Sequence, residues 1–242
     1  MSMTSTLAWR LFRHEAKRGE LTIILLAIVL SVGAVLSLSL FSERLQGALK
    51  ERSAAFIAAD AQLRSDTPIN DTWLQQARDE GLNTAKQVTT RSMVFHRDEM
   101  SLVDLRAVNE NYPLKGTVNI TDVPFGQKEA ATDLPKPGEV WLQSLLFQTL
   151  KLSLGDSIEI GDAEFTVTKV LVDIPDAGFS VFNTEPIALI RLSDLDATAI
   201  TGPGSRARYV GYFEGERSAI SNFYDWLSPN LQDDLHLSLI HI

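Results

Sequence analysis

The stretch from Leu21 to Phe41 constrains this chain more than any other part, because its 21 residues include no charged side chain. As an α-helix that rises about 1.5 Å per residue, the stretch would be about 30 Å long, which matches the hydrocarbon thickness of a bilayer. The sequence therefore predicts a transmembrane helix over residues 21–41. Every other window is more polar, so we expect a single span with a large domain on one side.

The charges on the two sides of this stretch predict its orientation. Residues 1–20 carry four basic and two acidic side chains, whereas residues 42–242 have a net charge of −11. Lysine and arginine close to a span stay in the cytoplasm, so we expect a cytoplasmic N-terminus and an exported main part. A cleaved signal peptide is the alternative, since Ser37-Leu38-Ser39 could pass for a cleavage site, but the apolar core is too long for one.

Residues 1–20 are predicted to form a cytoplasmic amphipathic helix. Basic side chains at helical spacing form one stripe of it, and aromatic side chains suit the membrane interface. The residues of this predicted surface for the membrane or a partner are Trp9, Arg10, Arg13, Lys17 and Arg18. Simple positive-inside flanking charge explains the same residues equally well.

Two pairs of small residues lie within the predicted span, each pair four positions apart: Ala27 with Ser31, and Gly33 with Ser37. Small side chains let helices approach closely, which in lipid replaces the hydrophobic drive to associate. The pairs therefore indicate packing against further transmembrane helices outside this chain.

The segment after the span contains no proline and one glycine as far as residue 58, so residues 42–58 are predicted to continue the same helix as a stalk. A half-buried strand follows. Asn70 and Gly81 then suit the two ends of a helix over residues 71–80. Two β-rich runs, 84–95 and 100–108, are predicted to pair through a polar hairpin loop.

The second half of the chain alternates short strands with loops. Residues 109–138 contain four prolines, and Gly161-Asp162 predicts a tight hairpin turn. A strand over residues 208–214 and a helix over residues 218–227 come near the end. Two βαβ-like pieces thus flank a β-rich insertion, which predicts an α+β fold with a split βαβ layout.

Catalytic and cofactor chemistry finds no support in the sequence. The chain has no cysteine, its four histidines lack metal-ligand spacing, and no phosphate-binding or nucleophile motif occurs. The acidic pairs Asp173 with Asp176 and Asp194 with Asp196 are expected to be solvated turn residues. We therefore expect no enzyme activity, cofactor or metal, and the acidic exported part disfavours nucleic acid as a partner.

Several motifs, in this order and spacing, resemble permeases of the MacB, LolC and FtsX group of ABC transporters, and within that group the large YbbP-type permeases. They follow the basic helix, span and stalk, and are Leu105–Gly116, Gly138–Leu142, Leu150–Gly161 and Asp173–Phe179. The resemblance covers nearly the whole chain but only the first part of such a permease. The family's later spans, and the cytoplasmic loop through which it engages its ATPase, are absent from this chain.

The resemblance implies a bacterial inner-membrane permease whose main domain is periplasmic. It divides the exported part into a porter-like lobe, residues 59–116 and 206–234, and an inserted β-rich lobe, residues 117–205. It also implies mechanotransmission, in which a separate cytoplasmic ATPase hydrolyses ATP and the stalk relays the motion to the periplasmic side. The implied partners are that ATPase subunit, the remaining transmembrane helices and membrane lipid.

Two alternatives stay open at this point. The chain could be a single-span, membrane-anchored periplasmic binding or sensor module, although 20 N-terminal residues are too few for a cytoplasmic output domain. Residues 237–242 match one reading frame of a sequencing-library transposase adaptor, CTG TCT CTT ATA CAC ATC, which predicts an adaptor-derived tail. A native apolar strand, or the start of a second span, is the other interpretation of these residues.

Overall fold

The structure is a computed structural model that describes residues 20–55, 58–177, 185–202, 204–230 and 235–239. The chain divides into two compact units, residues 1–52 and residues 53–242. The first contains most of one long helix, and the second is a mixed α+β domain. The predicted α+β class with one N-terminal apolar helix is confirmed.

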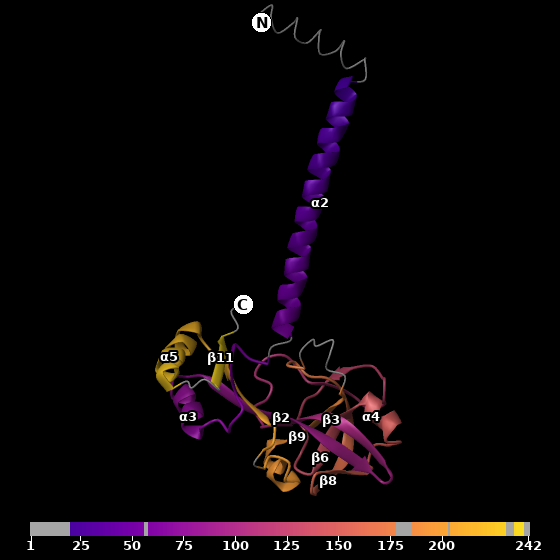
Figure 1. Ribbon diagram of the computed structural model, residues 1–242, viewed down its shortest axis with the longest axis vertical. Coiled ribbons are helices and arrows are strands. Elements are labelled where there is room, and N and C mark those ends of the chain that lie inside the picture. Colours follow the sequence, from indigo (N-terminus) through magenta and orange to yellow (C-terminus); the bar gives the residue numbers. More distant parts are fainter. Residues whose placement is uncertain (1–19, 56–57, 178–184, 203, 231–234, 240–242) are drawn as a thin grey trace, which may run out of the picture. The chain divides into compact units, whose positions relative to one another are not determined.

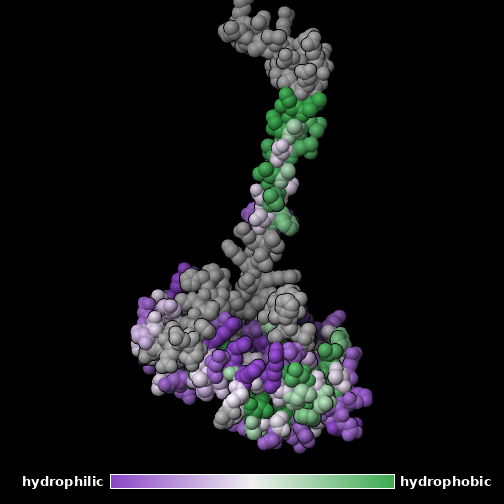
Figure 2. All heavy atoms as spheres, viewed as in Figure 1, coloured by the Kyte–Doolittle hydropathy of each residue, from purple (hydrophilic) through white to green (hydrophobic). Residues whose placement is uncertain are grey.

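Helix α2 runs from Glu20 to Ala55 without interruption, so the apolar stretch and the segment after it form one helix (Figure 1). Within it, the 22 residues from Ile23 to Arg44 are long and apolar enough to cross a membrane. Their side chains are exposed, and Figure 2 shows hydrophobic groups around this part of the helix. An apolar surface on all sides of a helix is stable only when lipid or other helices cover it.

The second unit is built on one mixed sheet, which has eleven strands among the described residues. Its strand order is β11-β1-β10-β2-β3-β9-β6-β8-β4-β5, with β7 paired to both β2 and β8. The strands are β1 (Ala61–Ser65), β2 (Asn83–His96), β3 (Glu99–Val108), β4 (Asn119–Thr121), β5 (Glu129–Ala130), β6 (Glu139–Gln143), β7 (Ser157–Ile160), β8 (Ala163–Asp173), β9 (Ile187–Arg191), β10 (Arg208–Glu214) and β11 (Leu235–Leu239).

Helices lie at both ends of this sheet. They are α3 (Asp71–Asp79), α4 (Ser144–Thr149) and α5 (Arg217–Leu227), together with the 3₁₀ turns η2 (Leu192–Asp194), η3 (Asp196–Thr198) and η4 (Ser228–Asn230). Figure 1 shows α3 and α5 side by side, away from α4. The predicted caps of α3 are confirmed: Asn70 accepts a hydrogen bond from the Thr72 amide, and Gly81 has a φ of +84°.

Two split βαβ units interlock in one part of the sheet. Strands β1 and β2 are joined through α3, and β10 lies between them, antiparallel to both. Strands β10 and β11 are joined through α5, and β1 lies between them in the same way. The sequence predicted a split βαβ layout without a strand order, and the structure adds the position of β10 and the second unit, which needs β11 from Leu235 onward.

The hairpin between β2 and β3 is tighter than expected. The sequence predicted a four-residue loop, but His96 and Glu99 form the last pair of the ladder, so the turn is Arg97-Asp98 alone. Arg97 has a φ of +53°, the left-handed conformation that two-residue hairpin turns require. Near this end of β2, Val94 and Phe95 also pair with Ile160 and Glu159 of β7.

Apolar side chains pack on both faces of the sheet. On one face, α3 and α5 cover β1 and β10, with Leu63, Leu74, Phe213 and Phe223 fully buried between them. A larger cluster beside it includes β2, β3, β6, β8 and α4. On the opposite face, the loops around Tyr112 and Ile174 cover β3, β6 and β9. That face leaves β1, β10 and part of β2 without a covering helix.

The sheet continues from the predicted porter-like lobe into the predicted inserted lobe, because β3 pairs directly with β9 in parallel. The lobe boundaries therefore remain predictions. Residues 235–239 form β11 and pair with β1, as the native-strand interpretation of the C-terminal residues expects. Any apolar segment can pair with an open strand edge, so the origin of residues 237–242 also remains a prediction.

Candidate functional site

The candidate site lies on the sheet face that faces away from α3 and α5. Successive side chains of a strand point to opposite faces, so Leu63 and Phe213 point toward the helices while Arg64 and Tyr212 point away. The register places Val210 directly opposite both Arg64 and Gln87. Polar residues of four neighbouring strands therefore share this face.

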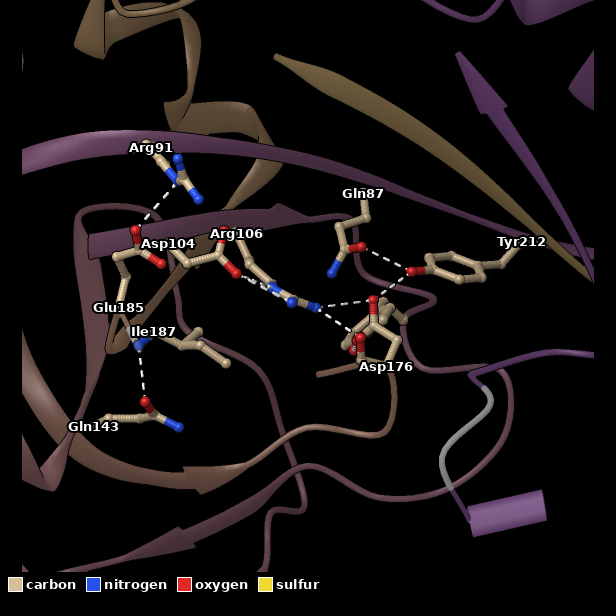
Figure 3. Close-up of polar contacts among 10 residues, drawn as sticks. Gln87, Arg91, Asp104, Arg106, Gln143, Asp176, Glu185, Ile187 and Tyr212 are labelled. Atoms are coloured by element: carbon tan, nitrogen blue, oxygen red, sulfur yellow. Dashed lines mark hydrogen bonds and ion pairs between the residues drawn. The ribbon is translucent and has the colours of Figure 1, made fainter. Parts of the chain in front are cut away.

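Arg106 of β3 is the centre of the site, and its side chain is only 7% exposed. Its Nε and Nη2 atoms each donate to Asp104 Oδ2 at 3.1 Å. Its Nη1 atom donates to the backbone oxygen of Asp176 at 3.1 Å and lies 3.1 Å from the Oδ2 atom of that carboxylate (Figure 3). A buried cation thus lies between two carboxylates that are 11% and 14% exposed.

Asp176 also accepts hydrogen bonds from two buried phenols, Tyr112 on one oxygen and Tyr212 on the other. Burial raises the pKa of both tyrosines well above the ordinary value, and the negative charge of Asp176 raises it further. Burial alone would lower the pKa of Arg106, but Asp176 and Asp104 raise it. All three groups therefore keep their protons and act as fixed donors.

Gln87 completes the cluster from β2 and is almost fully buried. Its Oε1 atom lies 2.7 Å from the Tyr212 hydroxyl, and its Nε2 atom has no hydrogen-bond partner among the described residues. The Tyr212 hydroxyl has one proton and can donate it to one acceptor at a time. The charged Asp176 is a stronger acceptor than the amide oxygen of Gln87. In either orientation of the amide, one polar atom of Gln87 is left without a partner in the described part of the chain.

The edge of the site is more open. Arg91, whose side chain is 66% exposed, lies 3.4 Å from Glu185. Gln143 accepts a hydrogen bond from the Ile187 amide at 2.9 Å and so ties β6 to the start of β9 (Figure 3). The Arg91–Glu185 pair therefore joins the two predicted lobes beside the polar cluster, whereas the Gln143 contact lies within the predicted inserted lobe.

A cavity of about 770 Å³ opens over this cluster. Gln87, Arg106, Asp176 and Tyr212 form part of its lining, and strands β1, β2, β3 and β10 all contribute to it. This size is within the range of small-molecule binding sites. The lining is mostly polar, and within the described ranges no cluster of three or more histidine or acidic side chains could hold a metal ion.

The residues that the sequence singled out lie elsewhere. Trp9, Arg10, Arg13, Lys17 and Arg18 fall outside the described residues. Ala27, Ser31, Gly33 and Ser37 are all exposed on α2. At 3.6 residues per turn the two pairs lie on different sides of the helix, so α2 presents two small-residue surfaces rather than one. Their contact with other helices remains a prediction.

The polar cluster itself was missed, and for Asp176 the expectation of a solvated turn residue is wrong. The side chain is buried against Arg106 and two tyrosines. One signal was available, because Asp104 and Arg106 alternate with apolar residues inside a run that is otherwise apolar and β-rich. Two opposite charges on one face of a strand indicate a paired, buried site.

The family of the chain follows from comparison with known proteins. The family model for the MacB-like periplasmic core domain matches residues 21–219, which is most of the chain. The chain therefore belongs to the MacB-like periplasmic core domain family, and its class is that of ABC transporter permeases with a membrane-anchored periplasmic domain.

Among individual relatives, the chain is 33% identical over 225 residues to the uncharacterized ABC transporter permease YbbP of Escherichia coli strain K12. The match covers 93% of this chain and 27% of that permease, so the chain spans about a quarter of the relative's length.

Two solved structures are similar in fold at low identity. The extracellular domain of the noncanonic ABC-type transporter YknZ from Gram-positive bacteria is 12% identical, with a TM-score of 0.48 over 74% of this chain and 99% of that one. The periplasmic region of MacB from Actinobacillus actinomycetemcomitans is 10% identical, with a TM-score of 0.47 over 76% of this chain and 90% of that one.

Proposed function

We propose that this chain is the N-terminal part of an ABC transporter permease that relays motion from a cytoplasmic ATPase to its periplasmic domain. The observation that carries the proposal is the unbroken helix α2, whose 36 residues include both the apolar stretch and most of the predicted stalk, as far as Ala55. A helix without a break transmits displacement, whereas a coil would absorb it. ATP hydrolysis takes place in a separate subunit, and the remaining transmembrane helices complete the permease.

The proposed orientation places the N-terminus in the cytoplasm and residues 53–242 in the periplasm. The basic leader and acidic remainder support this topology. Alkaline phosphatase fused after Asp66, an exposed residue just beyond β1, should be active in intact cells. A fusion that is stably expressed but inactive would reverse the orientation.

The relay itself can be tested by distance measurements, because the chain has no native cysteine. Cysteines at Glu43 in α2 and Gln75 in α3, both exposed, would carry spin labels in a full-length permease without other cysteines. Addition of ATP in the presence of the ATPase should change the distance distribution between them. Labels at Gln75 and Glu164, both within the periplasmic domain, give the control distance. Identical distributions with and without ATP for the first pair would contradict the relay.

A further inference from the structure

The cavity over the polar cluster has an unusual charge pattern for this protein. Five arginines contribute to its lining, although residues 42–242 together carry a net charge of −11. The three acidic residues of the lining are already engaged, Asp104 and Asp176 by Arg106, and Glu185 by Arg91. The lining as a whole therefore carries a formal charge of +2, and the arginines outside these ion pairs are the other three.

Those three are Arg64, Arg206 and Arg208, and all are exposed. None forms an ion pair within the part of the chain that the structure describes. The register brings two of them together: Arg64 lies opposite Val210, and Arg208 is two positions before Val210 on the same face. Arg206 approaches the same opening from the segment that leads into β10.

Mutual repulsion between neighbouring guanidinium groups disfavours such a cluster unless a negative charge neutralises it. Guanidinium groups present planar forks of donors that match the oxygens of phosphate and carboxylate groups. At the floor of the cavity, one polar atom of the buried Gln87 amide lacks a partner among the described residues. A ligand that reaches from the arginines to Gln87 would neutralise the arginines and also give the Gln87 amide a hydrogen-bond partner.

We propose that this cavity binds a phosphate-bearing anion, which Arg64, Arg206 and Arg208 hold at the rim and Gln87 contacts at the floor. The cluster around Arg106 supports the site structurally. The charge of Arg106 itself is neutralised by Asp104 and Asp176. The phosphate could belong to a soluble anion or to a lipid head group. Since binding needs neither ATP nor the ATPase, the site stands apart from the proposed relay.

The test uses the whole 242-residue chain in neutral detergent micelles. Isothermal titration calorimetry with inorganic pyrophosphate examines the soluble source, and titration with dibutyryl phosphatidylglycerol examines the lipid head group. We expect saturable binding of at least one probe, and the tighter one identifies the source. No saturable binding of either probe would overturn the proposal.

The triple variant Arg64→Gln, Arg206→Gln and Arg208→Gln should weaken binding about tenfold or more, because it removes three charged donors. A matched control, Arg97→Gln, Lys128→Gln and Arg217→Gln, removes the same charge from exposed residues outside the cavity lining. The control should change the affinity by less than about twofold, because salt screens distant surface charges. An equal loss in both variants, or none in the first, would overturn the proposal.

Discussion

Arg106→Met is expected to lower the free energy of unfolding of the periplasmic domain by about 3–5 kcal/mol. Methionine keeps an unbranched apolar stem but removes the guanidinium charge that Asp104 and Asp176 share, so both carboxylates stay buried without a cation. Urea denaturation of residues 53–242, followed by circular dichroism, measures the difference. A loss this large is a substantial fraction of the stability of a typical domain.

The matched control is Arg91→Met, because Arg91 faces the same cavity but is mostly exposed in its pair with Glu185. An exposed ion pair contributes at most about 1 kcal/mol, so this variant should unfold nearly like the wild type. If both substitutions lowered the free energy of unfolding equally, burial of the Arg106 cluster would not explain the effect of Arg106→Met.

Ala48→Pro in a full-length permease is expected to abolish coupling between ATP hydrolysis and the activity of the periplasmic domain. Position 48 lies inside α2, next to Gly47, the only glycine of the predicted stalk. A glycine in a helix interior costs about 1 kcal/mol relative to alanine, which the helix tolerates. A proline costs about 3 kcal/mol or more, because it removes a backbone hydrogen bond and clashes with the preceding turn.

The measurement is a transport-dependent phenotype at matched membrane levels of the protein, with ATPase assembly checked by co-purification. Ala48→Ser is the control, since serine leaves the backbone hydrogen bond in place. A passive anchor would function equally well when bent. A proline variant that behaves like the wild type would therefore show that α2 serves as a tether, and the relay proposal would fail.

Much of the fold could be predicted because its signals are local. The capping residue Asn70, the left-handed Gly81 and the turn at Gly161-Asp162 each act within a few positions of the chain, and the structure confirms them. Strand order is a different matter, because it depends on pairing between distant segments. Nothing close to β3 in sequence indicates that its parallel neighbour is β9, which begins at Ile187.

The candidate site was harder to predict for the same reason. Arg106 and Asp176 are 70 positions apart, and Tyr212 is another 36 positions further. Apart from the alternation at Arg106, the local sequence around each of these residues gives no sign of a buried site. An aspartate in a proline-containing loop, for example, normally faces water. Only the sheet, by placing β3 and β10 on either side of β2, brings these groups to one face.

The position of β1 in the sheet has a consequence for how the domain forms during synthesis. This strand is the first of the domain to leave the ribosome, yet Ala61 pairs with Phe213 and Leu239, more than 140 residues later. Contacts that span so much chain form slowly, and an unpaired strand edge can meet the wrong partner meanwhile. The hairpin of β2 and β3 needs only residues 83–108 for its pairing, so we expect folding to begin there. The first strand to be made is then among the last to be placed.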